Sequence, residues 1–596
     1  MTTTKRYALL AADTDRTQDY VFESARLPEI RGASVILSEL NERDAPARIR
    51  KLDETAEEIY AAGGGLLYKV DADKAPEIQR ALESLYPEKT GVTTITCVIQ
   101  PVPDNAEDGY TGLLSLEAIN RALAGLTEYQ RWRIFTQYGY TPEDLKEQWP
   151  DALDAERYAV AHNFGEWVRL LGVRLRRRKQ EKRYAPFVEA PPHARRCQSC
   201  RIRPAAAVYP HYGEPMSLCA ECRQKSLHSE RFPWRDEFDR KLREYHPQLA
   251  EKYFAIAEQG TVPLDIGVIG LACNPRNRNK SGYVAFIYAD GDGVGSFVES
   301  CCTRDDYRKM SQHLRDATWY AVTFALANNL AIQILDNPMS AEETTEQRKR
   351  ATQPFEIITV GGDDVMLVVP AHVALRVARD MAVKFTEYLE KEGIKGKDRP
   401  LTLSAGLVIA PQHMPVRLMR DFARELLKKG AKPRAKETEF AAVDFQIFTS
   451  TAIYGSDIMS MRARPPYSIR PLGKPDDKPL HLYHRPYTIP ELNNLLGALD
   501  ALNDANFPVS QLYPLAGALE RGRRRATLFY LYQRSRIKNK KHRDALAKVE
   551  AIIEAQEKRD PLPWYKALPG ATYTFSTTLR DVAELYDFAE SEEVTA

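Results

Sequence analysis

The stretch that decides the fold of this chain is Phe355-Glu356-Ile357-Ile358-Thr359-Val360-Gly361-Gly362-Asp363-Asp364-Val365-Met366-Leu367-Val368-Val369. Two apolar runs flank a glycine pair, which predicts two buried strands joined by a tight turn. Asp363 and Asp364 follow the glycines, and adjacent carboxylates repel each other unless cations or hydrogen bonds compensate them. Hard divalent cations such as Mg²⁺ bind one or two carboxylates together with substrate phosphates. The pair therefore indicates a site for Mg²⁺ or Mn²⁺, with a solvated hairpin tip as the alternative.

A second carboxylate stretch lies upstream, at Tyr283-Val284-Ala285-Phe286-Ile287-Tyr288-Ala289-Asp290-Gly291-Asp292-Gly293-Val294-Gly295. It predicts a buried strand that ends at Asp290, followed by a glycine-rich turn whose backbone amides can approach a triphosphate. A strand-end Asp together with an Asp-Asp hairpin is the metal-site layout of palm-type nucleotide polymerases and nucleotidyl cyclases. We therefore predict that Asp290, Asp363 and Asp364 are the catalytic residues and the Mg²⁺ ligands.

The N-terminal part of the chain repeats this pattern. Three of its segments match later ones in the same order: Tyr7–Asp15 with the strand ending in Ala289–Asp292, Glu58–Leu67 with Glu356–Val365, and Thr93–Ile99 with Leu401–Ile409. Three ordered matches predict an internal duplication. In this alignment Gly65 and Leu66 stand where Asp363 and Asp364 stand. We expect a first copy that keeps the fold without the metal carboxylates and packs against the active copy, contributing to a shared nucleotide site.

Four of the eight cysteines have the spacing of a metal site. Cys197-x-x-Cys200 and Cys219-x-x-Cys222 are separated by 18 residues, which is within the range of four-thiolate zinc sites. Four thiolates complete the tetrahedral shell of Zn²⁺ and leave no open position for water, so a structural site is predicted. Disulfides are the alternative. Cysteines kept as thiols or metal ligands are typical of a reducing cytoplasm.

The bulk composition excludes little by itself. The chain has 596 residues with 84 basic and 82 acidic groups, a net charge of +2. Its length predicts several domains, and its near-neutral charge means that only local clusters can indicate nucleic-acid binding. No run approaches the ~20 apolar residues that span a bilayer, and the start lacks the apolar core of a signal peptide. We expect a cytoplasmic protein without membrane partners.

Breaks in composition divide the chain into four predicted domains. These are a degenerate first palm domain at 1–105, a helical domain with the four-cysteine zinc site at 106–275, a catalytic second palm domain with Gly-Gly-Asp-Asp at 276–465, and a C-terminal helical domain at 466–596. The predicted fold class is α+β, with palm domains of the ferredoxin-like, nucleotidyl cyclase type.

Three basic segments allow two interpretations each. Arg174–Arg183 is either a solvated helix face or a contact for a nucleic-acid backbone. Between Arg521 and Arg543, basic residues alternate with Phe529, Tyr530 and Tyr532, which are either core aromatics or contacts for RNA or an acidic partner. In the predicted helix Phe422–Lys432, Lys428 and Lys432 either complement the helix dipole or reach the triphosphate.

These ordered motifs resemble the large, polymerase-like subunit of type III CRISPR effector complexes, in particular the Cmr-type branch. The resemblance covers essentially the whole chain. It rests on Gln18-Asp19-Tyr20-Val21-Phe22, Arg31-Gly32-Ala33-Ser34, the four cysteines between the two palms, Ala289-Asp290-Gly291-Asp292, Gly361-Gly362-Asp363-Asp364, Ser404-Ala405-Gly406, Val443-Asp444-Phe445 and Arg485-Pro486-Tyr487-Thr488. One departure is that none of the eleven histidines is followed by Asp, so we expect no HD nuclease.

The resemblance implies a Mg²⁺-dependent nucleotidyltransferase that makes cyclic oligoadenylates from ATP when the complex binds target RNA. Partners would be the other effector subunits, guide RNA and target RNA. Two divalent ions would activate the ribose hydroxyl and stabilise the departing pyrophosphate. The predicted nucleotide contacts are Gly291, Asp292, Gly293, Gly361, Gly362, Ser404, and Lys428 or Lys432. The inserted Gly430 lengthens that helix and obscures which lysine meets phosphate.

Three other functions fit parts of the pattern. A stand-alone GGDEF-type cyclase would share the hairpin, but it would not need a degenerate second palm. A reverse transcriptase or RNA polymerase would share the carboxylates and would require a template. A catalytically silent scaffold would keep the palms only to hold RNA and neighbouring subunits, but the intact carboxylates of the second palm weigh against that role.

Overall fold

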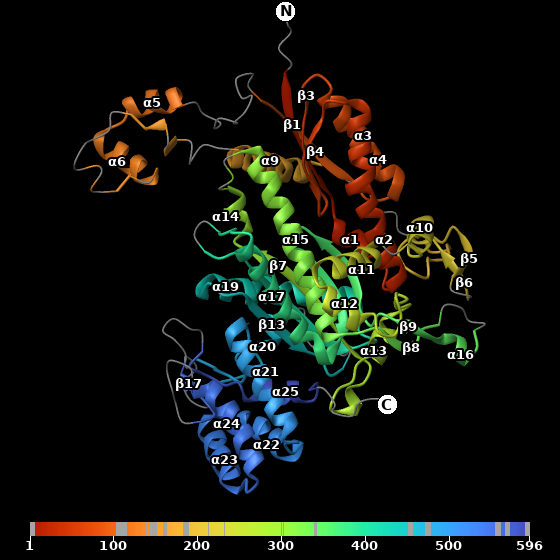
Figure 1. The fold of residues 1–596 in the computed structure, drawn as a ribbon, viewed down its shortest axis with the longest axis vertical. Coiled ribbons are helices and arrows are strands. Elements are labelled where there is room, and N and C mark those ends of the chain that lie inside the picture. The colour runs from red at the N-terminus through yellow and green to blue at the C-terminus, as the bar shows by residue number, and fades with distance from the viewer. Residues whose placement is uncertain are drawn as a thin grey trace, which may run out of the picture.

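The computed structural model describes residues 6–102, 116–138, 140, 141, 143, 145, 152–155, 157, 158, 164–182, 190–211, 214–231, 233–299, 301, 303–338, 343–396, 399–450, 457–470, 478–554, 562–566 and 573–589. The N-terminal sheet and its helices lie at one end, a larger sheet lies in the middle, and C-terminal helices form the other end (Figure 1). No helix in the described part of the chain is both long and apolar enough to cross a bilayer.

The first palm is a four-stranded antiparallel sheet in the order β2-β3-β1-β4. Its strands are β1 (Tyr7–Thr14), β2 (Glu57–Ala62), β3 (Gly65–Asp71) and β4 (Ile95–Pro101). Because side chains alternate along a strand, Ala8, Leu10 and Ala12 of β1 pack towards one helical layer and Leu9 and Ala11 towards another. The first layer contains α2 (Leu27–Glu39), α3 (Ala45–Leu52) and α4 (Ala75–Thr90). A short π-helix, η1 (Leu40–Asp44), joins α2 to α3, and the short α1 (Thr17–Val21) precedes α2.

The second palm is a six-stranded sheet in the order β10-β11-β7-β12-β13-β16. The strands are β7 (Tyr283–Asp292), β10 (Glu356–Gly361), β11 (Asp364–Pro370), β12 (Thr402–Pro411), β13 (Ala442–Ile447) and β16 (Tyr487–Thr488). One face packs on α15 (Arg304–Asn329) and α17 (Ala374–Lys391). The other packs on α18 (Val416–Glu425), the short π-helix η4 (Leu426–Ala431) and α19 (Lys432–Thr438). The predicted strand–turn–strand at the centre is therefore confirmed.

The predicted duplication is confirmed by the strand orders, because β2-β3-β1-β4 matches β10-β11-β7-β12. The predicted alignment of the two hairpins was wrong by one residue. Ala62 pairs with Gly65 in the first hairpin as Gly361 pairs with Asp364 in the second, and both hairpins carry a bulge at the same place. Gly64 and Gly65, not Gly65 and Leu66, therefore occupy the positions of Asp363 and Asp364.

The two palms are held together by the Arg31-Gly32-Ala33-Ser34 motif of α2. Arg31 donates two hydrogen bonds, of 2.8 and 2.7 Å, to the Glu356 carboxylate on β10, and both side chains are buried. Ser34 Oγ donates to the Ile358 carbonyl at 2.5 Å. Gly32 has no room for a side chain, because a Cβ there would lie 1.8 Å from the Lys225 carbonyl oxygen.

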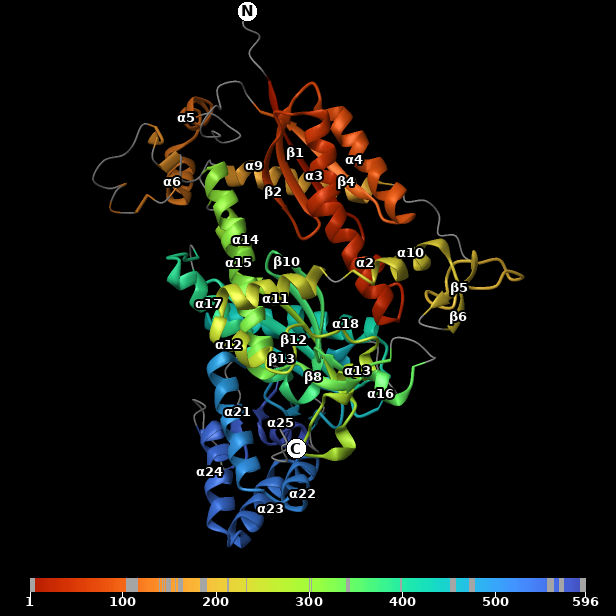
Figure 2. The ribbon, with the colours of Figure 1, turned by 45° about the vertical axis from the view of Figure 1, so that its right-hand side comes forward.

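The region predicted as one helical domain at 106–275 is distributed over the molecule. Helices α5 (Leu116–Ala124) and α6 (Glu128–Gln137) stand apart with a small core of their own (Figure 2). Helix α9 (Phe164–Glu181) packs on the first sheet. The cysteine module, with β5 (Ala207–His211), β6 (Glu214–Leu218) and α10 (Ala220–His228), packs on α2. The second palm receives α11 (Pro233–Tyr245), α12 (Pro247–Tyr253) and α13 (Ile266–Leu271).

One face of the basic end of α9 packs against the first palm, whereas Arg174, Arg176 and Arg177 outside that face are exposed. Lys179 and Lys182 form ion pairs with Asp13 and Asp15 of the first palm, and Arg178 forms one with Glu83. Both interpretations from sequence were incomplete, because Asp13 and Asp15, the partners of the two lysines, lie about 165 positions earlier in the chain.

The C-terminal part is not purely helical. It contributes β16 to the palm sheet and a small sheet of β14 (Ser468–Ile469), β15 (Leu480–His481), β18 (Phe575–Ser576) and β17 (Tyr565–Lys566). Its helices are α20 (Ile458–Arg462), α21 (Ile489–Asp504), α22 (Val509–Leu519), α23 (Arg523–Arg536), α24 (Lys540–Glu554) and α25 (Leu579–Tyr586). Of the three aromatics on α23, Tyr530 is core while Tyr532 is 52% exposed.

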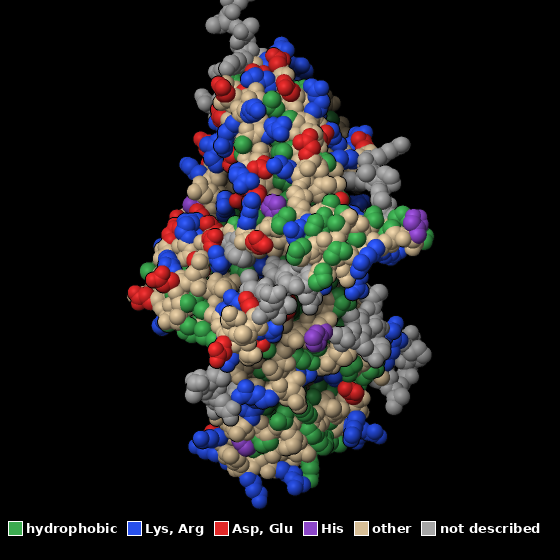
Figure 3. All heavy atoms as spheres, turned by 90° about the vertical axis from the view of Figure 1, so that its right-hand side faces the viewer, with side chains coloured by type: hydrophobic (Ala, Val, Ile, Leu, Met, Phe, Trp, Pro, Cys, Tyr) green, Lys and Arg blue, Asp and Glu red, His purple; other side chains and the backbone are tan. Residues whose placement is uncertain are grey.

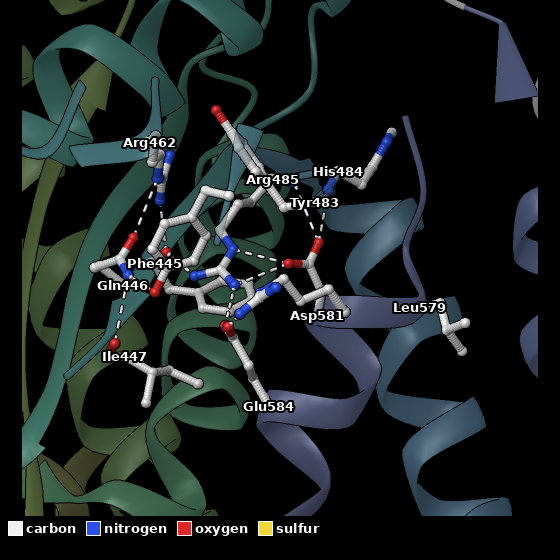
Figure 4. Close-up of polar contacts among 12 residues, drawn as sticks. Phe445, Gln446, Ile447, Arg462, Tyr483, His484, Arg485, Leu579, Asp581 and Glu584 are labelled. Atoms are coloured by element: carbon white, nitrogen blue, oxygen red, sulfur yellow. Dashed lines mark hydrogen bonds and ion pairs between the residues drawn. The ribbon is translucent and has the colours of Figure 1, made fainter. Parts of the chain in front are cut away.

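Arg485 joins this part to the second palm (Figure 4). Its buried guanidinium donates to Asp581 at 2.9 Å and to Glu584 at 2.5 Å on α25, and to the Phe445 carbonyl of β13 at 2.8 Å. The predicted boundary at 465/466 therefore cuts through a continuous core. The remaining elements are α14 (Val294–Glu299), β8 (Gln333–Asp336), α16 (Thr345–Arg348), β9 (Lys349–Thr352) and two 3₁₀ turns, η2 (Arg278–Lys280) and η3 (Ala371–Val373).

Candidate active site

The three predicted catalytic carboxylates meet at one end of the second sheet. Val365 pairs with Ala289, and this register places Asp364, which begins β11, beside Asp290 of β7. The turn between β10 and β11 is tight because Gly362 adopts a φ of 65°, a left-handed conformation that glycine accepts without strain. The turn thereby aims Asp363 at the same point. Rigid strands thus hold all three groups.

Mutual repulsion and burial dominate the electrostatics of this cluster. Burial, followed by the charge of Asp290, raises the pKa of Asp363 to about 6. Burial and the charges of Asp290 and Asp363 raise the pKa of Asp364 well above its ordinary range. Crowded carboxylates resist ionisation unless a cation joins them. The donor set therefore fits hard divalent cations, which prefer carboxylate oxygens.

Three glycines at the end of β7 and just after it have different structural roles. A Cβ on Gly291 would lie 2.6 Å from Asp363 Oδ2, so this glycine admits the carboxylate of the neighbouring hairpin. Gly293 has a φ of 80° and turns the chain into α14. A Cβ on Gly295 would meet nothing within 4 Å, so the space beside this residue is open.

Asp292 and Ser404 do not belong to the carboxylate cluster. Asp292 is 3% exposed and accepts hydrogen bonds from Thr402 Oγ1 at 3.0 Å and Ser404 Oγ at 2.6 Å. Ser404 is fully buried and accepts one from the Ala442 amide. Both were predicted as nucleotide contacts. Instead, they form an internal bridge between β7 and β12, because residues two apart on a strand share a face.

Of the two candidate lysines, only Lys432 reaches the cluster. Its ammonium forms an ion pair with Asp290 and donates to the Gly291 carbonyl at 2.9 Å, whereas Lys428 is exposed. The inserted Gly430 is accommodated in the short π-helix η4, where a Cβ would lie 2.0 Å from Asp444 Oδ2. This short helix carries the chain past Lys428 and brings Lys432 to the carboxylates.

The first palm closes the other side of the site. Its glycine turn touches that of the second, since a Cβ on Gly361 would lie 3.0 Å from Gly63 Cα. A cavity of about 230 Å³ lies between α1, α2 and both turns, and its lining includes Gly64, Gly361 and Asp364. Of the predicted contacts, Gly361 therefore lines a cavity next to the carboxylates.

Tyr60 is a site residue that sequence reasoning missed. It comes from β2 of the first palm, and its phenol oxygen lies 3.8 Å from where a Cβ on Gly362 would be. Burial raises the pKa of Tyr60, and the nearby carboxylates Asp363 and Asp364 raise it further. The phenol therefore stays protonated and can donate a hydrogen bond. The signal was the alignment itself, which places Tyr60 three residues before Gly63, the first of the first-palm glycines.

The four predicted cysteines form one buried cluster. The Sγ atoms of Cys197, Cys200, Cys219 and Cys222 all lie within 4.8 Å of one another. All four are free thiols, so the disulfide alternative is wrong. The Cys222 amide donates to Cys219 Sγ at 3.4 Å, a contact that stabilises a thiolate. The arrangement fits a single tetrahedral ion with no open position.

Comparison with known proteins agrees with this geometry. Residues 283–440 match the family model described as Cas10/Cmr2, second palm domain. The second palm is therefore a Cas10/Cmr2 palm domain, as its resemblance to type III CRISPR subunits predicted. No curated protein sequence matches the chain.

Solved structures with a similar course of the chain include Csm1 alone and Csm1–Csm4 cassettes. A Csm1–Csm4 cassette in complex with cA3 is 13% identical over 98% of this chain and 70% of that one, with a TM-score of 0.49. A Csm1–Csm4 cassette in complex with cA4 is 14% identical, covering 76% and 56%, with a TM-score of 0.39. Csm1 in T. onnurineus is 14% identical, covering 74% and 52%, also with a TM-score of 0.39. This chain thus spans about half to 70% of their lengths.

Proposed function

We propose that this chain is the signalling subunit of a type III CRISPR effector complex and makes cyclic oligoadenylates, or related adenylates, from ATP when target RNA binds. The observation that carries the proposal is the convergence of Asp290, Asp363 and Asp364 in a domain that matches the Cas10/Cmr2 second palm. A palm retained only as a scaffold gains nothing from three crowded carboxylates, which raise one another's pKa.

In this proposal the carboxylates hold two divalent cations, Mg²⁺ or Mn²⁺. Bound there, such ions favour the ribose alkoxide and stabilise charge on the α-phosphate and the departing pyrophosphate. Asp290, Asp363 and Asp364 supply the oxygen ligands. Lys432 adds a fixed positive charge beside Asp290, and it would neutralise phosphate oxygens as negative charge develops.

The acceptor nucleotide is proposed to enter from the first palm. The 230 Å³ cavity opens beside Asp364 and is lined on its far side by α1 and α2. Polar groups line it, including Ser38 and Asn41, and these can orient a base or a ribose. Tyr60 of the first palm, whose phenol lies near the Gly362 turn, is proposed to donate a hydrogen bond to phosphates bound there.

The cysteine cluster is proposed to hold one structural Zn²⁺. Because α10 of this module packs on α2, and α2 carries Arg31 and Ser34, the ion would stabilise the helix that joins the two palms. Other effector subunits, guide RNA and target RNA are the proposed partners, and the Cmr-type branch remains the assignment from the motifs.

The test is reconstitution with guide RNA and partner subunits, followed by addition of target RNA, ATP and Mg²⁺, with and without S-adenosylmethionine. Products are identified by mass spectrometry. Asp363→Ala with Asp364→Ala is expected to lower synthesis by at least about 10³-fold, because it removes two of the three cation ligands. The variant should still assemble and bind target RNA.

The outcomes separate the functions. An adenylate product that requires target RNA and is lost in the double variant supports the proposal and names the messenger. Synthesis that survives the double variant refutes the assignment of the carboxylates. An assembled, RNA-bound complex that makes no product supports the scaffold function, and a product that needs a copied template supports a polymerase.

A further inference from the structure

A second cavity lies away from the carboxylates. Its volume is about 1010 Å³, and it shares no lining residue with the cavity between the palms. Its walls come from the α1–α2 connection, the Gln198–Arg201 cysteine loop, the start of α13, the Gln412–Val416 connection and Arg348 of α16. We call it the Arg26 groove. Figure 3 faces this side of the molecule and shows Lys and Arg side chains along the lower edge of the projecting cysteine module.

The positive charges of the Arg26 groove are not neutralised within the described part of the chain. Arg26, Arg201 and Arg348 line it, and none of the three guanidinium groups makes an ion pair among the residues described. The Arg348 Nε atom is buried and has no hydrogen-bond acceptor there. Three arginines thus line one groove without an acidic partner among the described residues.

The acidic residues of the groove are already engaged. Glu23 forms ion pairs with Arg203 and Lys225, the latter at 3.0 Å. Asp265 accepts a hydrogen bond from the Val268 amide at 3.1 Å and caps α13. The net field in the groove is therefore positive. The first turns of α2 and α18, neither of which has a side-chain cap, add the positive ends of two helix dipoles.

The shape and lining identify the kind of ligand. The volume of the groove, about 1010 Å³, lies at the upper end of the roughly 300–1,000 Å³ typical of small-molecule sites. No phenylalanine, tyrosine or tryptophan lines it, so it offers no platform for stacking bases. Guanidinium groups bind phosphate oxygens bidentately, and the exposed side chains of Gln198 and His413 add polar contacts at the rim. These features suit a phosphodiester backbone read without regard to base sequence.

We propose that the Arg26 groove binds the backbone of single-stranded RNA. The choice of RNA rests on the proposed function, in which RNA is the activating partner; the phosphate chemistry rests on the groove alone. The groove places that strand between the cysteine module and the loops that lead into α2 and α18. A strand held there contacts both the helix that joins the palms and the second palm itself.

The experiment measures binding of the full chain to a fluorescently labelled 12-nucleotide U12 RNA by anisotropy, between 50 and 200 mM salt. The test variant is Arg26→Ala with Arg201→Ala and Arg348→Ala. Each lost phosphate contact lowers the slope of log affinity against log salt by about 0.7. We expect the slope to fall by about 2, and affinity at 100 mM salt to fall about 10- to 100-fold, equally for U12 and A12.

Two matched variants keep the result interpretable. Lys51→Ala with Arg80→Ala and Lys89→Ala removes the same charge from exposed positions on α3 and α4 and should leave affinity within about twofold. Arg26→Lys with Arg201→Lys and Arg348→Lys keeps the charge and should keep most of the salt slope. If the triple alanine variant shows no thermal unfolding transition, and so is not folded, Arg26→Glu replaces it as the test variant. Its affinity for U12 is expected to fall about tenfold.

The proposal is overturned if the alanine variant binds U12 with unchanged affinity and slope, or if the Lys51 control loses as much. It is also overturned if the alanine variant loses affinity for dT12 while U12 is unaffected. Asp363→Ala with Asp364→Ala must bind U12 normally. A chain that binds RNA through these arginines but makes no adenylate keeps this inference and rejects the proposed function.

Discussion

In the first palm, Lys179 lies 2.7 Å from Asp13 and donates to the Thr14 carbonyl at 3.1 Å. In the second palm, Lys432 pairs with Asp290 and donates to the Gly291 carbonyl. The strand registers make Asp13 equivalent to Asp290 and Thr14 equivalent to Gly291. The two ammonium groups therefore make the same pair of contacts, although α9 carries one and the segment after η4 carries the other.

The next carboxylate extends the correspondence. Asp15 accepts hydrogen bonds from Thr94 and Thr96, as Asp292 does from Thr402 and Ser404. Burial raises the pKa of Asp292. Burial acts on Asp15 as well, but Lys182 and the two hydroxyls outweigh it and lower the pKa. The first palm thus neutralises its carboxylates with built-in lysines, whereas the second leaves a surplus of negative charge for diffusible cations.

The largest expected effect comes from removing the built-in cations. Lys179→Met with Lys182→Met should lower the free energy of unfolding by about 3–5 kcal/mol, because Asp15 is left charged and buried. Arg174→Met with Arg176→Met, on the exposed face of the same helix, is the control and should change it by less than about 0.5 kcal/mol. Urea unfolding at pH 7.5 measures both.

The pH dependence of that pair has a defined sign. Asp15, with its lowered pKa, stabilises the wild-type fold above the unfolded pKa, and this contribution is lost as the pH falls. In the variant no lysine opposes burial and only the Thr94 and Thr96 hydroxyls still lower the pKa of Asp15, so Asp15 takes up a proton at a higher pH than in the wild type. The difference in the free energy of unfolding between variant and wild type should therefore become smaller from pH 7.5 to pH 4.5. A difference that stays constant over this range would contradict this account.

The second effect concerns the equivalent lysine of the active palm. Lys432→Met should lower kcat for adenylate synthesis by about 100-fold, because it removes a preorganised charge beside the reacting phosphates. Lys428→Met, four residues earlier and exposed, should leave kcat within about twofold. Equal losses in the two variants would mean that neither lysine acts through the carboxylates.

The third effect is a gain in stability. Asp363→Asn should raise the free energy of unfolding of the metal-free protein by roughly 2 kcal/mol at pH 8, because a pKa of about 6 means that ionised Asp363 destabilises the fold. The gain should shrink as the pH falls towards 4, where the folded state holds the proton and the unfolded state is about half protonated. Asp13→Asn, which removes a carboxylate paired with Lys179, should give no such gain.

The smallest effect tests the contribution of the first palm to the reaction. Tyr60→Phe should lower kcat about tenfold while the melting temperature stays nearly constant, since only a hydroxyl near the turn is lost. Tyr307→Phe, at the other ring of the same edge-to-face pair, is the control. A loss confined to KM would assign Tyr60 to binding alone.

Much of the fold followed from local patterns. Alternating apolar strands, the Asp-Asp turn and the cysteine spacing each depend on residues close in sequence, and they predicted both palms and the thiolate cluster. The one-residue error in the first hairpin has a physical cause. Gly63, Gly64 and Gly65 carry no side chains to fix a register, so the sequence alone could not show which two of them correspond to Asp363 and Asp364.

Contacts between distant segments could not be predicted in this way. A basic helix end gives no sign that Asp13 and Asp15 lie opposite it. Ser404 was assigned to nucleotide because its motif adjoins the site, but the alternation of β12 turns it towards Asp292. β16 is two residues long, and a pairing that short leaves no periodic signal.

The buried Arg31–Glu356 pair limits how the molecule can be switched. Separating the two palms would either expose Arg31 and Glu356 to solvent or leave each buried without its partner; their side chains are now 4% exposed. Breaking such a buried pair costs about 3–5 kcal/mol. That is close to the 5.5 kcal/mol needed to move a two-state equilibrium from 1:99 to 99:1. An activator that worked by separating the palms would spend most of its binding free energy on this one contact. Activation is therefore expected to proceed through small shifts of the turns and of Lys432, within a pair of palms that stays closed.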